Sequence, residues 1–258
     1  MDYTQRLKWI ENGFNADRPG LSPSLLEDRM TEPPAPSESL IKLPLKHVAL
    51  FRPEHYEPGY AYPLVIWLHP DGDSEHALHE IMPQISTRNY LGLSFRAPAI
   101  NPKAPEKGYY WPDSHLFVKQ FANQLQQTVQ ELTKVLHIHE QRIYLAGTGT
   151  GCSVATKLLL QMPHYFAGAA LFKGRFGKTD FQNVSSVKLK NKRILLDHSL
   201  ANAPDDPVSA SLVARMWQST GVQMQSVNSL KAELSHESEL MAALNRWIME
   251  GVSTARLV

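Results

Sequence analysis

The sequence predicts an α/β protein in which a mostly parallel central sheet carries helices on both faces. Strand-like and helix-like segments alternate from about residue 40 to the end, with short connections between them. Some strand segments are almost wholly apolar, as in YPLVIWLHP, which is typical of strands buried on both faces of a parallel sheet. A chain of 258 residues, 43% of them hydrophobic, can form one large core. We therefore expect an N-terminal arm or linker over residues 1–39 and one α/β domain over residues 40–258.

The first half of the chain sets out this alternation. Residues 1–39 are polar and end near the prolines of TEPPAPSES, which interrupt regular structure. The segments that follow predict, in order, strands at 40–53 and 62–70, a helix at 74–85, a strand at 89–98 and a long amphipathic helix at 114–136. Pro83 either kinks the first helix or begins another. Five apolar residues form the buried stripe expected on the long helix: Phe121, Leu125, Val129, Leu132 and Leu136.

The second half repeats the pattern. We expect strands at 142–147, 165–172, 193–199 and 222–230, and helices from about 151 to Pro163, at 207–221 and at 237–250. The first of these helices carries Val154, Leu158 and Leu159, and Gly221 closes the second. The last helix has one apolar face, made of Leu240, Leu244, Trp247 and Ile248.

Composition excludes several classes of protein. The 26 basic and 25 acidic residues leave a net charge of +1, which provides no general field to attract nucleic acid. One cysteine, Cys152, allows no intramolecular disulfide, and the charged start MDYTQRLKWIENG does not resemble a signal peptide, so we expect a cytoplasmic location. No run approaches the roughly 18 apolar residues of a membrane span, so we expect no integral membrane association.

The segment Arg142–Ser153, RIYLAGTGTGCS, is the most informative motif in the chain. It predicts an apolar strand that enters a Gly-x-Gly-x-Gly turn and then a helix, where a serine hydrolase has Gly-x-Ser-x-Gly. Gly149 occupies the position of the nucleophile. A nucleophile turn requires positive φ, and glycine meets that demand without supplying a hydroxyl or a thiol.

Several features in order along the chain resemble the α/β-hydrolase superfamily, in particular its small carboxylesterase and phospholipase-like branch. They are a strand ending in HPDG, the GTGTG turn before a helix, an acidic loop after a late strand, and His236 just before the last helix. The resemblance spans about residues 40 to 250. It implies an α/β-hydrolase fold, an ancestry of ester or thioester hydrolysis, and a nucleophile serine replaced by Gly149.

The same resemblance implies positions for the other catalytic groups. His236 matches the base, although an ordinary histidine at a helix N-terminus fits its place as well. The acid falls on Asp206 or Asp205 if the loop has a short insertion, and on Asn202 if it has none. Asp206, which precedes Pro207, is the preferred candidate, and the alternative is an aspartate that only begins a turn.

An oxyanion hole and a ligand site are implied in the same way. The two backbone donors would be the N–H groups of Thr150 and Asp71, while the aromatic side chains of Tyr110 and Trp111 would line the substrate cleft. The family's usual His-Gly is His69-Pro70 in this chain. Carboxylates at Asp71 and Asp73 would oppose the negative charge that such a hole stabilises.

Other chemistry is less well supported by the residues. Thr148, Thr150 and Ser153 do not offer a convincing substitute nucleophile, and Cys152 fits a small buried residue at a close helix contact. Gly-x-Gly-x-x-Cys is a poor dinucleotide fingerprint, and no Gly-Lys-Ser/Thr follows as in a P-loop. The metal-ligand types between His69 and Glu80 match no metal motif, so we expect neither a metal nor a cofactor.

Three functions remain open from the sequence. The first is a catalytically degenerate esterase-like protein that binds a small ester or acyl ligand in the former active-site cleft. The second is an atypical or weak carboxylic-ester hydrolase in which His236 and Asp206 activate a water molecule. The third is an interaction module that uses the N-terminal arm. The sequence does not determine the oligomeric state.

Overall fold

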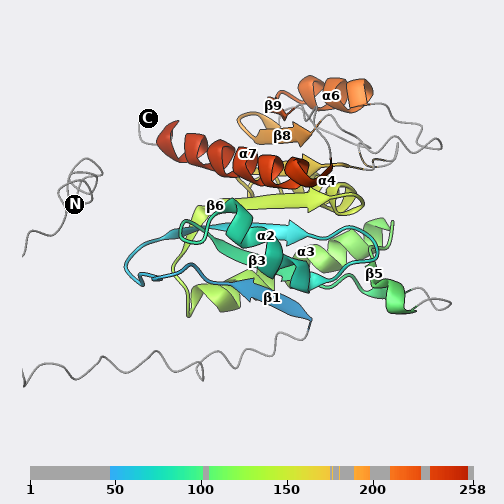
Figure 1. Ribbon diagram of the computed structural model, residues 1–258. Helices are drawn as coiled ribbons and strands as arrows, with labels where there is room; N and C mark the ends of the chain where they lie inside the picture. Colours follow the sequence, from blue (N-terminus) through green and yellow to red (C-terminus); the bar gives the residue numbers. More distant parts are fainter. Residues whose placement is uncertain are drawn as a thin grey trace, which may run out of the picture. The chain divides into compact units, whose positions relative to one another are not determined.

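In the computed structural model, the described residues are 47–100, 105–174, 176, 180, 189–197, 210–227 and 233–254. The predicted arm over residues 1–39, and its boundary with the domain at residue 40, lie outside these residues. All of the following refers to the α/β unit from His47 onward, the part of it that the structure describes (Figure 1).

A seven-stranded sheet forms the centre of this unit, with the strand order β1-β3-β2-β6-β7-β8-β9. Only β1 runs antiparallel to its neighbour, and all other pairs are parallel, so the predicted mostly parallel sheet is confirmed. The strands are β1 (Val48–Phe51), β2 (Tyr62–Leu68), β3 (Leu91–Phe95), β6 (Ile138–Thr148), β7 (Gly168–Phe172), β8 (Arg193–Asp197) and β9 (Gln223–Val227). A separate two-stranded hairpin pairs β4 (Ala99–Ile100) with β5 (Tyr109–Tyr110).

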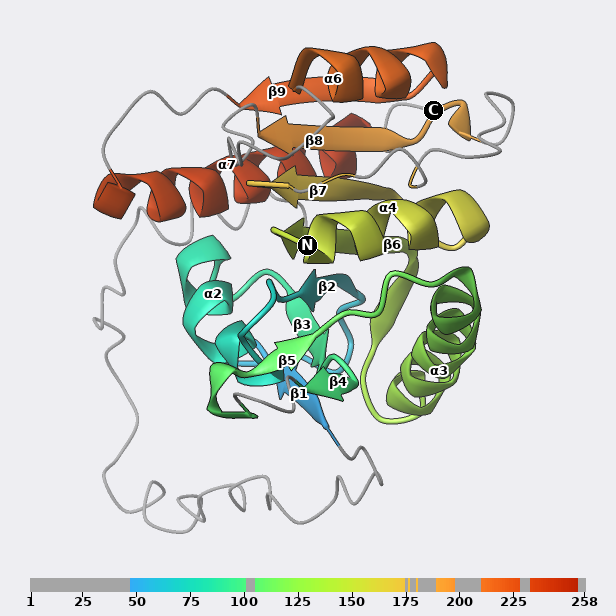
Figure 2. The same cartoon turned by 90° about the vertical axis from the view of Figure 1, so that its right-hand side faces the viewer.

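Helices cover both faces of the sheet, as the alternating pattern predicts. On one face lie α2 (Leu78–Ile85) and α7 (Glu233–Thr254), and on the other lie α3 (His115–Thr133), α4 (Gly151–Gln161) and α6 (Ala210–Ser219). Figure 2 shows α2 to the left of the strands and α3 to the right. Each face therefore has its own hydrophobic core.

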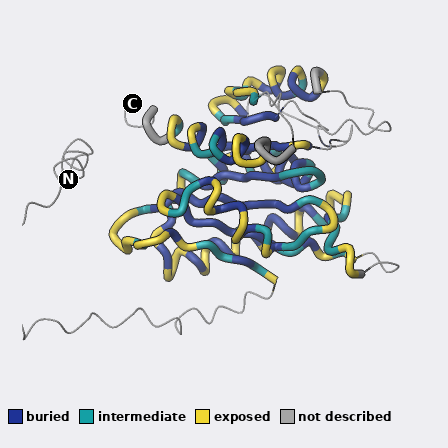
Figure 3. The backbone as a smooth tube through the Cα atoms, viewed as in Figure 1, coloured by how far each residue is buried: buried dark blue, intermediate teal, exposed yellow. Residues whose placement is uncertain are grey.

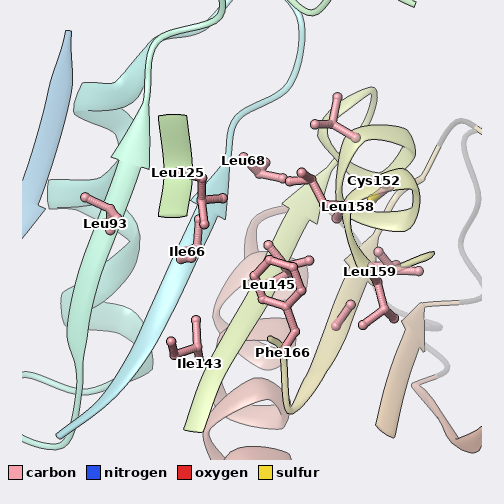
Figure 4. Packing of buried hydrophobic residues seen from close by; sticks show 14 of the residues in the cluster. Ile66, Leu68, Leu93, Leu125, Ile143, Leu145, Cys152, Leu158, Leu159 and Phe166 are labelled. Atoms are coloured by element: carbon pink, nitrogen blue, oxygen red, sulfur yellow. The ribbon is translucent and has the colours of Figure 1, made fainter. Parts of the chain in front are cut away.

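The two cores explain why the central strands are apolar along their whole length. Every residue of β2, β3 and β7 is buried, which places these strands in the dark blue centre of Figure 3. On the α3 and α4 face, Ile66 and Leu145 pack with Leu125, Leu158 and Leu159 (Figure 4). On the other face, Leu240, Leu244, Trp247 and Ile248 of α7 pack against the sheet, as their spacing predicts.

Some element boundaries differ from the predicted ones. β6 begins at Ile138 rather than Arg142, because Ile138 pairs with Tyr62 before an irregularity that shifts the register of β2 against β6. A short 3-10 turn, η4 (Glu75–Ala77), precedes α2, and α2 continues through Pro83 to Ile85, so no new helix begins at the proline. α7 begins at Glu233 rather than Glu237 and takes His236 into its first turn.

Candidate functional site

The turn between β6 and α4 lies at the carboxyl edge of the parallel strands, where open α/β sheets place their ligand sites. β6 ends at Thr148, Gly149 has φ of +56°, and α4 begins at Gly151. The Gly149 N–H donates to the carbonyl of Phe172 at 3.2 Å, which ties the apex of the turn to the end of β7. The predicted strand, tight turn and helix are therefore all present, with Gly149 in the left-handed conformation.

The two outer glycines of GTGTG allow a close approach of backbone to backbone. A Cβ on Gly151 would lie 2.2 Å from the Leu68 carbonyl oxygen, and a Cβ on Gly147 would lie 2.7 Å from the Gly151 carbonyl group. Real side chains do not occupy such space, so both positions require glycine while α4 rests on β2 and β6. Their role is to bring the N-terminus of α4 against the sheet.

Gly149 differs from these two glycines because a side chain there meets fewer atoms. A Cβ would lie 3.2 Å from the Pro70 Cβ and 3.8 Å from the Pro70 Cα, with no closer neighbour among the described residues. Thr148, Gly149 and Thr150 are all partly exposed, so solvent reaches the apex. The apex presents a hydrogen atom, and Pro70 is the residue against which any larger group would press.

The two predicted backbone donors, Thr150 and Asp71, are brought together by the fold. The Asp71 N–H donates to the Thr150 Oγ1 at 3.1 Å, although the two residues are 79 positions apart in the chain. The Thr150 N–H has no acceptor within the part of the chain that the structure describes. One donor of the pair is thus occupied by a side chain of the protein, and the other is available.

His69 holds the loop that carries Pro70 and Asp71 through two hydrogen bonds to the backbone. Its side chain is fully buried, its Nε2 accepts the Ala97 N–H at 3.1 Å, and its Nδ1–H therefore donates to the Pro70 carbonyl at 2.7 Å. Burial lowers the pKa of His69 below its ordinary value of 6.5, and this outweighs the opposite effects of the Pro70 carbonyl and the nearby carboxylates Asp73, Glu75 and Asp71. His69 is a neutral structural residue that fixes Pro70 against Gly149.

Trp111 and Tyr110 differ in their access to solvent. The Trp111 side chain is only 8% exposed, donates its Nε1–H to the His69 carbonyl at 2.7 Å and packs against Phe121. Its backbone N–H donates to Asp71 Oδ1 at 3.4 Å. Tyr110 is partly exposed, and its hydroxyl donates to the Lys107 carbonyl at 3.5 Å. Trp111 thus braces the loop of Asp71, and Tyr110 is the more accessible of the two aromatic residues.

Cys152 is fully buried and points into the protein. Its Sγ lies 3.1 Å from the Gly147 carbonyl oxygen and 3.3 Å from the Phe172 carbonyl oxygen, and these two acceptors share its single S–H. Burial raises the pKa of the Cys152 thiol well above its ordinary range, which disfavours the thiolate that nucleophilic attack requires. The prediction that Cys152 is a small buried residue at a close helix contact agrees with this geometry.

Ser153 belongs to a partly buried polar network on α4. Its hydroxyl donates to Asp180 Oδ1 at 2.9 Å, and Lys157 donates to Asp180 at 2.9 Å and also to Asp113. Burial alone would lower the pKa of Lys157, but its bonds to Asp113 and Asp180 outweigh that effect and raise it. Lys157 is therefore a cation that holds two loops to α4, and it is not a base for Ser153.

Asp197 is a buried acidic residue at the edge of the sheet that carries the β6–α4 turn, and the sequence pattern did not identify it. It ends β8 at the same edge of the sheet, is fully buried, and accepts the Lys173 N–H on Oδ2 at 3.2 Å. Lys173 has φ of +47°, so this bond stabilises a strained turn directly after β7. An acidic residue that closes an otherwise apolar strand, as in RILLD, was the available signal.

The remaining predicted catalytic groups are not placed by the structure. The backbone of His236 belongs to the first turn of α7, and its side chain lies outside the described residues. Asp206, Asp205 and Asn202 also lie outside them. The pairing of His236 with an acid stays a prediction.

Two further searches concern metal ions and membranes. Within the described ranges, no group of three or more His, Cys, Asp or Glu residues is arranged to hold a metal ion. His76 and His79 lie with ring centroids 6.4 Å apart, and the exposed His76 contacts the buried Glu75 at 3.4 Å, while Glu75 is itself paired with Arg96. None of the helices in the described part of the chain is long and apolar enough to cross a bilayer.

Comparison with known proteins gives matches at the level of structure. No protein-family model and no curated protein sequence matches the chain. Solved structures do match. A fungal esterase from Rhizomucor miehei has a TM-score of 0.59 at 11% identity, over 79% of this chain and 78% of that one. The Bacillus cereus carboxylesterase has a TM-score of 0.58 at 14% identity, over 79% and 93%. The structure of YahD with malic acid has a TM-score of 0.53 at 20% identity, over 79% and 98%.

These similarities extend through the sheet and its helices rather than through one motif. The identities of 11%, 14% and 20% are too low to carry an activity from those proteins to this chain. What they share with it is the arrangement of strands and helices.

Proposed function

The chain has an α/β-hydrolase fold, and we propose that it is a catalytically degenerate member of the esterase-like proteins of that fold, which binds a small acyl compound over the β6–α4 turn. The observation that carries this proposal is Gly149. It occupies the apex of the turn with φ of +56°, where an acyl-transfer enzyme needs an oxygen or sulfur atom. Loss of the nucleophile alone removes about 10⁶ of rate in a serine hydrolase.

The surrounding residues do not replace the missing group. Cys152 is buried with a raised thiol pKa, and Ser153 donates to Asp180. The Thr150 hydroxyl accepts the Asp71 N–H, and no described residue offers it a base. Binding therefore fits these contacts better than turnover does.

The charges near the turn favour a neutral ligand. Asp71 is exposed and Asp73 partly exposed, and both carboxylates lie in the loop that supplies one of the two N–H donors. A carboxylate ligand would be repelled by them, whereas an ester or amide carbonyl can accept the Thr150 N–H without that cost. The solved esterases with the same fold support the choice of an acyl compound.

The proposal is tested by following ethyl butyrate by proton NMR in the presence of the purified protein. We expect saturation transfer from protein to ester, and no formation of ethanol or butyrate beyond the spontaneous rate. Hydrolysis by the native protein that disappears in His236→Ala would instead favour the weak hydrolase. Absence of any saturation transfer would exclude ester binding.

A matched pair of variants tests the role of Gly149. Gly149→Ser restores a hydroxyl at the apex, and Gly149→Ala adds only the Cβ, which must press on Pro70 at 3.2 Å in both cases. We expect a fluorophosphonate probe to label Gly149→Ser slowly and to label neither Gly149→Ala nor the native protein. Labelling of the native protein would contradict the proposal.

A further inference from the structure

The N–H groups of Thr150 and Asp71 form a pair of hydrogen-bond donors over the turn. We propose that the Thr150 hydroxyl occupies the Asp71 N–H of this donor pair in the absence of ligand, and that it thereby determines which ligands the site accepts. A ligand carbonyl that is to receive both the Thr150 and the Asp71 N–H must first displace the Thr150 Oγ1 from Asp71. This inference rests on the proposed function, because it specifies how the same site is regulated.

The position of Thr150 makes this bond informative. Thr150 is the N-cap residue of α4, where a threonine ordinarily accepts an N–H of the first helical turn. Its side chain makes no such capping bond. Its acceptor is directed instead to Asp71, at 3.1 Å. The hydroxyl therefore contributes to closing the donor pair and not to the stability of the helix end.

The surroundings keep the two partners in place. His69 donates to the Pro70 carbonyl, and the Trp111 N–H donates to the Asp71 carboxylate, so the loop that carries the Asp71 N–H is fixed on both sides. On the other side, Thr150 is held by the start of α4, whose Ser153 N–H donates to the Thr150 carbonyl at 3.1 Å. The bond closes without rearrangement, and it opens by rotation of one side chain.

The hydrogen bond between the Asp71 N–H and the Thr150 hydroxyl predicts that the site selects ligands by the strength of their acceptor atom. A weak acceptor, such as an ether oxygen, cannot displace the hydroxyl and gains only the Thr150 N–H. A carbonyl oxygen accepts two hydrogen bonds and can use both donors once the hydroxyl rotates away. Removal of the hydroxyl should therefore strengthen carbonyl binding by about 2- to 10-fold, the effect of one net hydrogen bond.

The first experiment needs no ligand. Amide hydrogen exchange at Asp71 is measured by NMR in the native protein, in Thr150→Ala and in Thr150→Ser, which keeps the hydroxyl. We expect Asp71 exchange to quicken by about 10-fold in Thr150→Ala and to change little in Thr150→Ser. Equal exchange in the native protein and Thr150→Ala would overturn the proposal.

The second experiment uses butyramide, a neutral carbonyl compound that the protein cannot hydrolyse readily, as the probe. We expect its dissociation constant to fall by about 2- to 10-fold in Thr150→Ala and to stay at the native value in Thr150→Ser. Equal affinity of all three proteins, or tighter binding in Thr150→Ser alone, would overturn the proposal. If butyramide binds to none of them, the proposed function fails, and the exchange of Asp71 still decides whether the hydroxyl closes the donor pair.

Discussion

At the scale of single residues, the chemistry of the turn follows from which side-chain atoms reach it. Gly149 provides none, Cys152 points into the core, and the Thr150 hydroxyl is engaged by the Asp71 N–H. His69 is neutral because burial lowers its pKa and because its Nε2 accepts the Ala97 N–H. The reactivity of Cys152 and the protonation of His69 can each be tested by one measurement.

Cys152 should not react while the protein is folded. Its side chain is fully buried and burial raises the pKa of the thiol, so the native protein should react with a disulfide reagent at about pH 8 only as fast as it unfolds. The measurement is thiol titration with and without concentrated guanidinium chloride, followed by intact mass. Rapid modification of the native protein would show that Cys152 is accessible at the turn.

His69 should make stability depend on pH. Because the pKa of His69 is lowered in the folded protein, the unfolded chain takes up its proton first as the pH falls below 6.5, and the stability that neutral His69 provides is then lost. His69→Gln should lower the free energy of unfolding by about 1–3 kcal/mol at about pH 8, and the difference from the native protein should narrow by about pH 5.5.

The measurement is urea denaturation at a series of pH values. His79→Gln is the matched control, since His79 is an exposed histidine on α2. A difference between native protein and His69→Gln that stays constant would show that folding does not lower the pKa of His69, and a difference that widens on acidification would show that folding raises it.

At the scale of elements, the glycines of GTGTG fix α4 against β2 and β6. The motif identified the turn correctly from sequence because three glycines at this spacing, after an apolar strand, have few alternative uses. It did not identify the contacts of Pro70 with Gly149 or of Asp71 with Thr150, because these join segments 79 residues apart. Contacts of that kind depend on tertiary packing, which local patterns do not encode.

Gly151→Ala tests the close approach of α4. The added Cβ would lie 2.2 Å from the Leu68 carbonyl oxygen, so α4 must move or the protein must lose stability. We expect a loss of about 1–3 kcal/mol or more in the free energy of unfolding, measured by urea denaturation. Gly59→Ala is the control, because nothing lies within 4 Å of its Cβ, and its effect should stay within about 0.5 kcal/mol. Equal stability of the two variants would contradict the described contact.

At the scale of the whole molecule, the predicted α/β-hydrolase fold with a mostly parallel sheet and helices on both faces is confirmed. It could be predicted because fully buried strands such as β2 read as continuous apolar runs, and amphipathic helices such as α3 show one apolar stripe. The predicted start of β6 was less accurate, because the polar first residues of this strand pair with β2 across an irregularity in register. Asp197 was missed because its burial depends on neighbouring strands.

The most direct test of the central claim is mass spectrometry of the native protein after incubation with p-nitrophenyl butyrate and, separately, with a fluorophosphonate. Because Gly149 offers only a hydrogen atom at the apex, we predict an unmodified intact mass in both cases. A butyryl or phosphonyl adduct mapped to the β6–α4 turn or to its neighbours would show that a nucleophile operates there and would contradict the account.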